Sequence, residues 1–133
     1  MADTTRISNA AATAEATAFA ALLNGGTLEI RSGSQPATAD TADAGTLLAV
    51  LTFANPAAAS VTNGVVTFDT ITADTSANAS GTAGYFRAKT SGGAAVWDGS
   101  IGTSGATLNI NSTGISAGAE VAVTSLTYTR NEG

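Results

Sequence analysis

The chain has 133 residues with ten acidic and five basic side chains, a net charge of −5, and no cysteine or histidine. This length fits a single domain. The missing residue types exclude disulfides, thiolate metal ligands, a cysteine nucleophile and the imidazole that most often serves as general base. The charges are scattered, so the chain lacks the basic face that nucleic acid requires, and it has no polybasic signal for a membrane. We expect no catalytic residues, no cofactor and no metal site, and therefore a protein that is not an enzyme.

The N-terminal part of the chain is rich in alanine and predicts a helix over residues 8–23. Ser8 or Asn9 can cap its start, and Asn24-Gly25-Gly26 provides a left-handed stop. Large apolar residues lie only at the ends of this segment, so its middle can pack closely only through alanine methyl groups. Isolated helices of this length are marginal in water, so we expect it to lie on the chain's own sheet or on a neighbouring subunit. We treat residues 1–25 as a helical arm and residues 26–133 as a β domain.

The pattern changes to that of strands after the glycines. Leu28 and Ile30 alternate with two charged residues, as in a half-buried strand. Residues 32–45 are polar with small side chains and predict a long loop. Residues 46–53 are apolar on both faces and predict a central strand covered on both sides.

Short turns and breaks in periodicity define the rest of the chain. Asn63-Gly64 tolerates positive φ at both positions and predicts a tight hairpin, and Ser91-Gly92-Gly93 predicts a second one. A change of phase near Thr124-Ser125 predicts a bulge. Seven or eight short strands at regular spacing indicate a mainly β fold, an antiparallel β-sandwich or a jelly-roll-like barrel.

The strand before the second hairpin carries a mixed set of side chains. Over residues 85–89 we expect Phe86 and Ala88 to point inward, and Tyr85, Arg87 and Lys89 to point outward. The two basic residues could contact an acidic neighbour, although an alternating edge of this kind is more often simply solvated.

Carboxylates are the remaining acid–base groups, and the closest pairs are Asp40 with Asp43 and Asp69 with Asp74. Such pairs could bind calcium or act in glycoside hydrolysis, but the spacing fits neither. We interpret Asp40 and Asp43 as solvated loop carboxylates. We interpret Asp69 and Asp74 as turn formers that accept local backbone hydrogen bonds.

The few aromatic residues offer one further candidate site. Trp97, Tyr85, Tyr128 and Phe86 could together form a platform on which a sugar stacks. The alternative is that the core needs Phe86 and Trp97, because aromatic residues are only 5% of the chain.

Several stretches of the chain resemble a known family. Residues 27–57 begin a strand with the pattern Leu-x-Ile-Arg-x-Gly-x-Gln-Pro and continue to a Leu-Leu-Ala-x-Leu strand that ends near Asn-Pro. The first pattern is carried by Leu28, Ile30, Arg31, Gly33, Gln35 and Pro36. Residues 71–87 and 96–110 fit in the same way. On these residues the chain is similar to small structural proteins encoded among the structural genes of tailed bacteriophages, and the likeness covers most of residues 27–129.

The resemblance implies a virion component that is assembled in the host cytoplasm. It favours a capsid decoration or cement protein whose partners are further copies of itself, as a homotrimer, and the major capsid protein or other virion proteins. The alternative is a module of the tail, baseplate or fibre, either structural or binding a receptor or glycan through Trp97 and the Tyr85 edge. Neither nucleic acid nor a membrane is expected as a partner.

Overall fold

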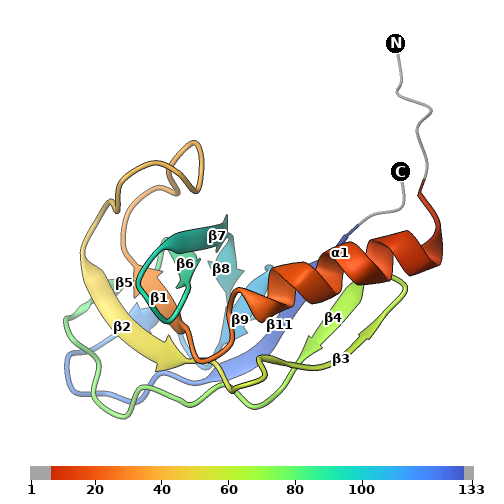
Figure 1. The fold of residues 1–133 in the computed structure, drawn as a ribbon. Helices are drawn as coiled ribbons and strands as arrows, with labels where there is room; N and C mark the ends of the chain where they lie inside the picture. The colour runs from red at the N-terminus through yellow and green to blue at the C-terminus, as the bar shows by residue number, and fades with distance from the viewer. Residues whose placement is uncertain (1–6, 131–133) are drawn as a thin grey trace.

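The computed structural model describes residues 7–130, and over these residues the protein is mainly β with one N-terminal helix (Figure 1). The elements are α1 (Asn9–Ala21), β1 (Thr27–Arg31), β2 (Leu47–Thr52), β3 (Ala58–Thr62), β4 (Val65–Phe68), β5 (Gly81–Thr82), β6 (Tyr85–Lys89), β7 (Ala95–Gly99), β8 (Ile101–Gly102), β9 (Leu108–Ile110), β10 (Gly114–Ile115) and β11 (Val123–Thr129). One sheet has the order β2-β1-β6-β7, a second has the order β3-β4-β11-β9-β8, and β5 pairs with β10.

The expected mainly β fold is confirmed, and the arrangement is sandwich-like. It is not a closed barrel, and one pair of strands, β8 with β9, is parallel. Apolar side chains of both sheets form one core, to which Leu28, Ile30 and Leu51 contribute from the first sheet and Leu108 and Ile110 from the second. The alternation predicted for residues 27–31 is confirmed, because Leu28 and Ile30 are fully buried.

The predicted helix forms within one or two residues of its expected bounds. Ser8 caps it by accepting a hydrogen bond from the Ala11 amide at 3.0 Å. Ala12, Ala16 and Ala20, each four residues apart, are buried against the hairpin of β3 and β4. The expected packing through alanine methyl groups is therefore confirmed, and the surface beneath the helix is the chain's own sheet. Residues 1–6 of the predicted arm lie outside the described residues.

The predicted turns and the predicted bulge are also confirmed. Asn63 and Gly64 have φ of 51° and 79° and join β3 to β4, and residues 91–93 join β6 to β7. The pairing of β11 with β9 shifts register between Val123 and Ser125.

The prediction of a central strand over residues 46–53 is wrong, because β2 lies at the end of its sheet. The irregular segment 72–79 covers its outer edge instead of another strand. Thr52 and Thr72 exchange two backbone hydrogen bonds, the Val50 amide donates to Asp74 Oδ2 at 2.9 Å, and the Asn78 amide donates to the Leu48 carbonyl at 2.7 Å. Covering by this segment explains why a strand at the end of a sheet can be so apolar.

The alternation predicted for residues 85–88 is confirmed, with Phe86 and Ala88 inward and Tyr85 and Arg87 on the outer face, but the expectation that this outer face is solvated is wrong. Residues 85–88 of β6 are all buried, so both faces of this strand are covered. The inner face packs into the core through Phe86 and Ala88. The outer face carries Tyr85 and Arg87 and lies beneath the loop formed by residues 32–46.

Candidate functional site

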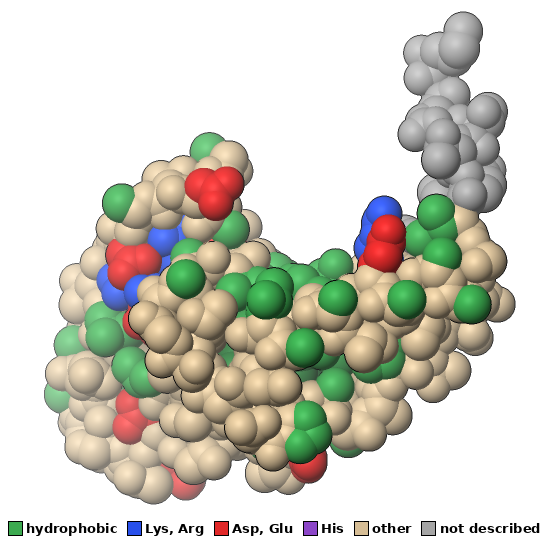
Figure 2. Space-filling view, in the orientation of Figure 1, with side chains coloured by type: hydrophobic (Ala, Val, Ile, Leu, Met, Phe, Trp, Pro, Cys, Tyr) green, Lys and Arg blue, Asp and Glu red, His purple; other side chains and the backbone are tan. Residues whose placement is uncertain are grey.

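The covered face of the first sheet holds a group of charged side chains that we call the charged cluster: Glu29, Arg31, Asp43, Arg87, Lys89 and Asp98. Strand register brings most of it together, since Glu29 of β1 lies opposite Arg87 of β6, and Arg87 lies opposite Asp98 of β7. Asp43 comes from the 32–46 loop, and Figure 2 shows the blue and red side chains gathered beneath this raised loop. Three acidic and three basic residues balance one another, so the cluster is neutral.

Arg87 is at the centre of the charged cluster and is 1% exposed. Its Nε and Nη2 donate to the two carboxylate oxygens of Asp98 at 2.7 and 2.8 Å. Its Nη1 donates to Asp43 Oδ1 at 2.9 Å and to the Thr41 carbonyl at 2.6 Å. The hydrogen bonds that Arg87 donates to Asp98, and then the one that it donates to Asp43, outweigh burial and raise the pKa of Arg87. The guanidinium therefore stays charged. Because Arg87 lies on β6, it links Asp98 of β7 to Asp43 and Thr41 of the loop.

Asp43 joins the loop to the other two cations. Its Oδ2 accepts from Lys89 Nζ at 2.8 Å and from Arg31 Nη2 at 3.1 Å. The hydrogen bond from Lys89 lowers the pKa of Asp43 the most, and burial opposes that shift. Burial lowers the pKa of Lys89, but hydrogen bonds to Asp43 and Glu29 outweigh it, so the pKa is raised. Asp43 and Asp40 are both exposed, as expected, but Asp43 is also paired with three cations, which its interpretation as a solvated carboxylate missed.

The loop is also held by uncharged contacts. The Tyr85 hydroxyl donates to the Ala44 carbonyl at 2.7 Å and accepts from the Ala44 amide at 3.1 Å. A hollow of about 480 Å³ lies between the loop and the strands and is lined in part by Arg87 and Lys89. Both of these cations already bind carboxylates, so the charged cluster serves to fix the loop.

Asp69 and Asp74 accept local backbone hydrogen bonds, as predicted. Asp69 Oδ1 accepts from the Thr70 amide at 2.8 Å, and Asp74 Oδ1 accepts from the Ser76 amide at 2.9 Å. Asp74 also binds the edge of β2 through the Val50 amide. No group of three His, Cys, Asp or Glu side chains that could hold a metal ion occurs within residues 7–130.

The aromatic residues do not share an exposed platform. Tyr85 and Phe86 are fully buried on opposite faces of β6, so neither can belong to the candidate stacking platform. Trp97 and Tyr128 are half-buried and meet the helix residue Phe19, whose ring stacks on Tyr128 at 3.8 Å and meets Trp97 edge to face at 5.4 Å. The side chain of Trp97 also contacts Phe86 edge to face at 4.9 Å. The alternative interpretation is confirmed, because Phe86 lies in the core and Trp97 packs against it.

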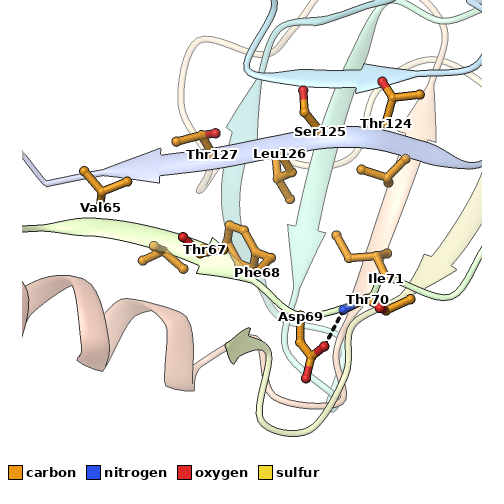
Figure 3. Close-up of a pocket in the computed structure, with 12 residues that line it drawn as sticks. Val65, Thr67, Phe68, Asp69, Thr70, Ile71, Thr124, Ser125, Leu126 and Thr127 are labelled. Carbon is orange, nitrogen blue, oxygen red and sulfur yellow. Dashed lines mark hydrogen bonds between the residues drawn. The ribbon is translucent and has the colours of Figure 1, made fainter. Parts of the chain in front are cut away.

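A groove of about 420 Å³ opens where β4 and β11 separate (Figure 3). The two strands pair only from Thr67 and Thr127 toward the hairpin end, and beyond that point Phe68, Ile71 and Leu126 point into the gap. Hydroxyl side chains line its rim. Phe68 also contacts the core, so this groove is an opening at the border of the sandwich.

A second groove lies between the helix and the edge of the second sheet, and we call it the α1–β3 groove. It has a volume of about 370 Å³ and is lined by Thr17, Ala20, Ala21, Asn24, Pro56, Ala58, Ser60 and Val61, none of which is charged. Leu22, which follows Ala21, is 53% exposed and is the most exposed large apolar side chain among the described residues. Figure 2 shows a row of apolar side chains along α1 beside it. Sequence reasoning missed this surface, because it depends on how the helix sits on the hairpin.

The comparisons with known proteins add no relative. No helix within residues 7–130 is both long enough and apolar enough to cross a membrane. No family model, curated protein or solved structure matches the chain.

Proposed function

We propose that this chain is a bacteriophage virion structural protein of the capsid decoration or cement type. In this role it stabilises the head by repeated non-covalent contacts with further copies of itself and with the major capsid protein. The resemblance of residues 27–129 to small phage structural proteins supports the virion assignment.

The observation that carries the proposal is that most of the basic side chains are paired with carboxylates within the molecule. Three of the five basic residues of the chain, Arg31, Arg87 and Lys89, are paired with carboxylates in the charged cluster. Such pairing leaves an exterior with few charged side chains, as Figure 2 shows for one face. Interface centres are depleted in charged residues, because burying an unpaired charge is costly. A surface of this kind can pack against neighbouring subunits without that cost.

The fixed loop supports the same role. The loop is long, and ordering it only on binding would cost conformational entropy. Asp43 and Tyr85 hold it before any partner arrives. A contact made through the loop is therefore preorganised, and many weak contacts of this kind sum over a lattice.

The proposal is tested on particles of the phage that encodes the chain. Quantitative mass spectrometry should find the chain in purified particles at a copy number in fixed proportion to the major capsid protein. Cryo-electron microscopy should place it on the outer surface of the head. Density on the tail or baseplate would overturn the decoration role alone, and absence from purified particles would overturn the virion assignment.

A contribution to head stability is measured on matched particles. Particles produced without the chain should release their DNA at a lower temperature than complete particles, and adding the purified chain should restore the higher temperature. Equal release temperatures would contradict a cement role.

A further inference from the structure

The four ends of the two large sheets differ in how they are protected. The outer edge of β2 is covered by the 72–79 segment. The edge strand β7 also has five residues, and its Asp98 is buried in the pair with Arg87 and does not guard the edge, whereas β8 has only two residues. The strand β3 has five residues, no charge and no proline, its one hydrogen-bonded neighbour among the described residues is β4, and it is the edge that borders the α1–β3 groove. An uncharged edge strand is a template for pairing with another strand.

The side chains beside this edge form a projection and a recess. Leu22 projects from the end of α1 into solvent, and the α1–β3 groove lies between the same helix end and β3. Ala21 and Ser60 line the groove, so the recess borders directly on the open edge. One surface therefore carries both an apolar projection and an apolar hollow of a size that accepts a leucine side chain.

Charge favours a second copy as the occupant of this surface. Two copies each carry a net charge of −5, so contacts between their acidic regions are disfavoured. The residues of β3 and of the α1–β3 groove are all uncharged, so this surface can meet its own copy without burying like charges. A strand edge is also self-complementary, because two antiparallel edges related by a two-fold axis satisfy each other's backbone groups.

We propose that two copies of this chain pair antiparallel along β3, with Leu22 of each copy entering the α1–β3 groove of the other. The inference rests on the proposed self-association and names the surface through which it occurs. A two-fold axis between the paired strands places both helices on the same face of one continuous sheet. The two grooves then face each other across the axis, and the exposed alanines of α1 permit a close approach of the helices.

Cysteine cross-linking tests the contact directly, because the natural chain contains no cysteine. Ser60→Cys places a thiol on the exposed edge strand, and oxidation should give a disulfide-linked dimer in high yield. Ser104→Cys is the matched control, since Ser104 is equally an exposed serine but lies in the turn between β8 and β9. Equal yields for both variants would contradict pairing along β3.

Charge variants test whether the contact is symmetric. Sedimentation should show that Ser60→Lys and Ser60→Asp each weaken self-association by about 10-fold or more, since like charges then meet across the axis. A mixture of the two variants should recover most of the natural affinity. Leu22→Ser should weaken association, whereas Val65→Ser, which removes another exposed apolar side chain (37% exposed) outside this surface, should not. Unchanged circular dichroism checks that each variant folds.

The outcomes separate this inference from the proposed function. Self-association of the natural chain that survives Ser60→Lys and gives no specific cross-link at residue 60 would overturn pairing along β3 and leave self-association standing. A trimer that gives no cross-link at residue 60 would also overturn pairing along β3 and leave self-association standing. A natural chain that stays monomeric up to about 1 mM would overturn both.

Discussion

Arg87 and Asp98 form a two-point ion pair across neighbouring strands, and their side chains are only 1% and 3% exposed. This pair anchors the charged cluster, because the same guanidinium also donates hydrogen bonds to Asp43 and to the Thr41 carbonyl of the 32–46 loop. A loop of small residues is thus held by a charge that lies beneath it.

Removal of Arg87 should strongly destabilise the fold. Arg87→Met leaves the buried Asp98 carboxylate without its partner, which costs about 3–5 kcal/mol for buried pairs. Urea denaturation measures this loss. Arg130→Met is the control, because the ion pair of Arg130 with Glu15 is exposed, and it should change stability by less than about 1 kcal/mol. Similar losses in the two variants would contradict the central position of Arg87.

The attachment of the loop should depend on acid pH through Asp43. The pKa of Asp43 in the folded protein lies below its ordinary value of 3.8, so its contribution is complete above that value and is lost as the pH falls through the lowered pKa. Amide resonances of residues 38–45 should therefore report release of the loop only below about pH 3.8. Asp43→Asn should show the released loop already at pH 7. A loop in Asp43→Asn that is as ordered as the natural one would contradict this role.

The turn between β3 and β4 should not tolerate a side chain at Gly64. Gly64 has φ of 79°, and an added Cβ would overlap the carbonyl oxygen of Arg130 and press on Ala12. Gly105 has a similar φ of 72° with nothing within 4 Å of the added atom. Gly105→Ala should cost only the backbone strain of about 1–2 kcal/mol, and Gly64→Ala should cost clearly more by thermal unfolding. Equal costs would show that the space around Gly64 is not limiting.

The helix should require a small side chain on its buried face. Ala16 is fully buried against β3 and β4, so Ala16→Leu should destabilise the protein by about 1–3 kcal/mol through overpacking. Ala18→Leu, on the exposed face, should stay within about 0.5 kcal/mol of the natural chain. Chemical denaturation of the two variants compares identical substitutions on opposite sides of one helix.

The single tryptophan should report whether the helix is docked. Trp97 contacts Phe19 of α1 edge to face, so Phe19→Ala should expose the indole and shift its fluorescence emission to longer wavelength. Phe53→Leu, a change farther along the core, serves as the control. An unshifted emission in Phe19→Ala would show that the helix does not shield Trp97.

Local sequence signals predicted the local structure well. Asn63-Gly64, the Ser8 cap and the alternation of Leu28 with Ile30 each depend on neighbours within a few residues, so they could be read before any fold was known. The pairing of Arg87 with Asp98 could also have been found, because the hairpin at residues 91–93 places them opposite each other.

The errors concern contacts between distant parts of the chain. Nothing near Asp43 indicates that it will reach Arg87, which is 44 residues away, and this contact decides whether the outer face of β6 is solvated. The apolar residues of β2 suggested a central strand, but the 72–79 segment covers its edge without forming a regular ladder. The α1–β3 groove likewise depends on the placement of a helix against a strand that lies far from it in sequence.

The covering of β2 by the 72–79 segment has a consequence for the size of any assembly. A chain with two open sheet edges can add copies at both ends without limit and grow into filaments. Here the β2 end of the first sheet is sealed by its own backbone, so no further copy can add there, and pairing along β3 would occupy one end of the second sheet. Strand addition through these two ends is then limited to a single pair of copies.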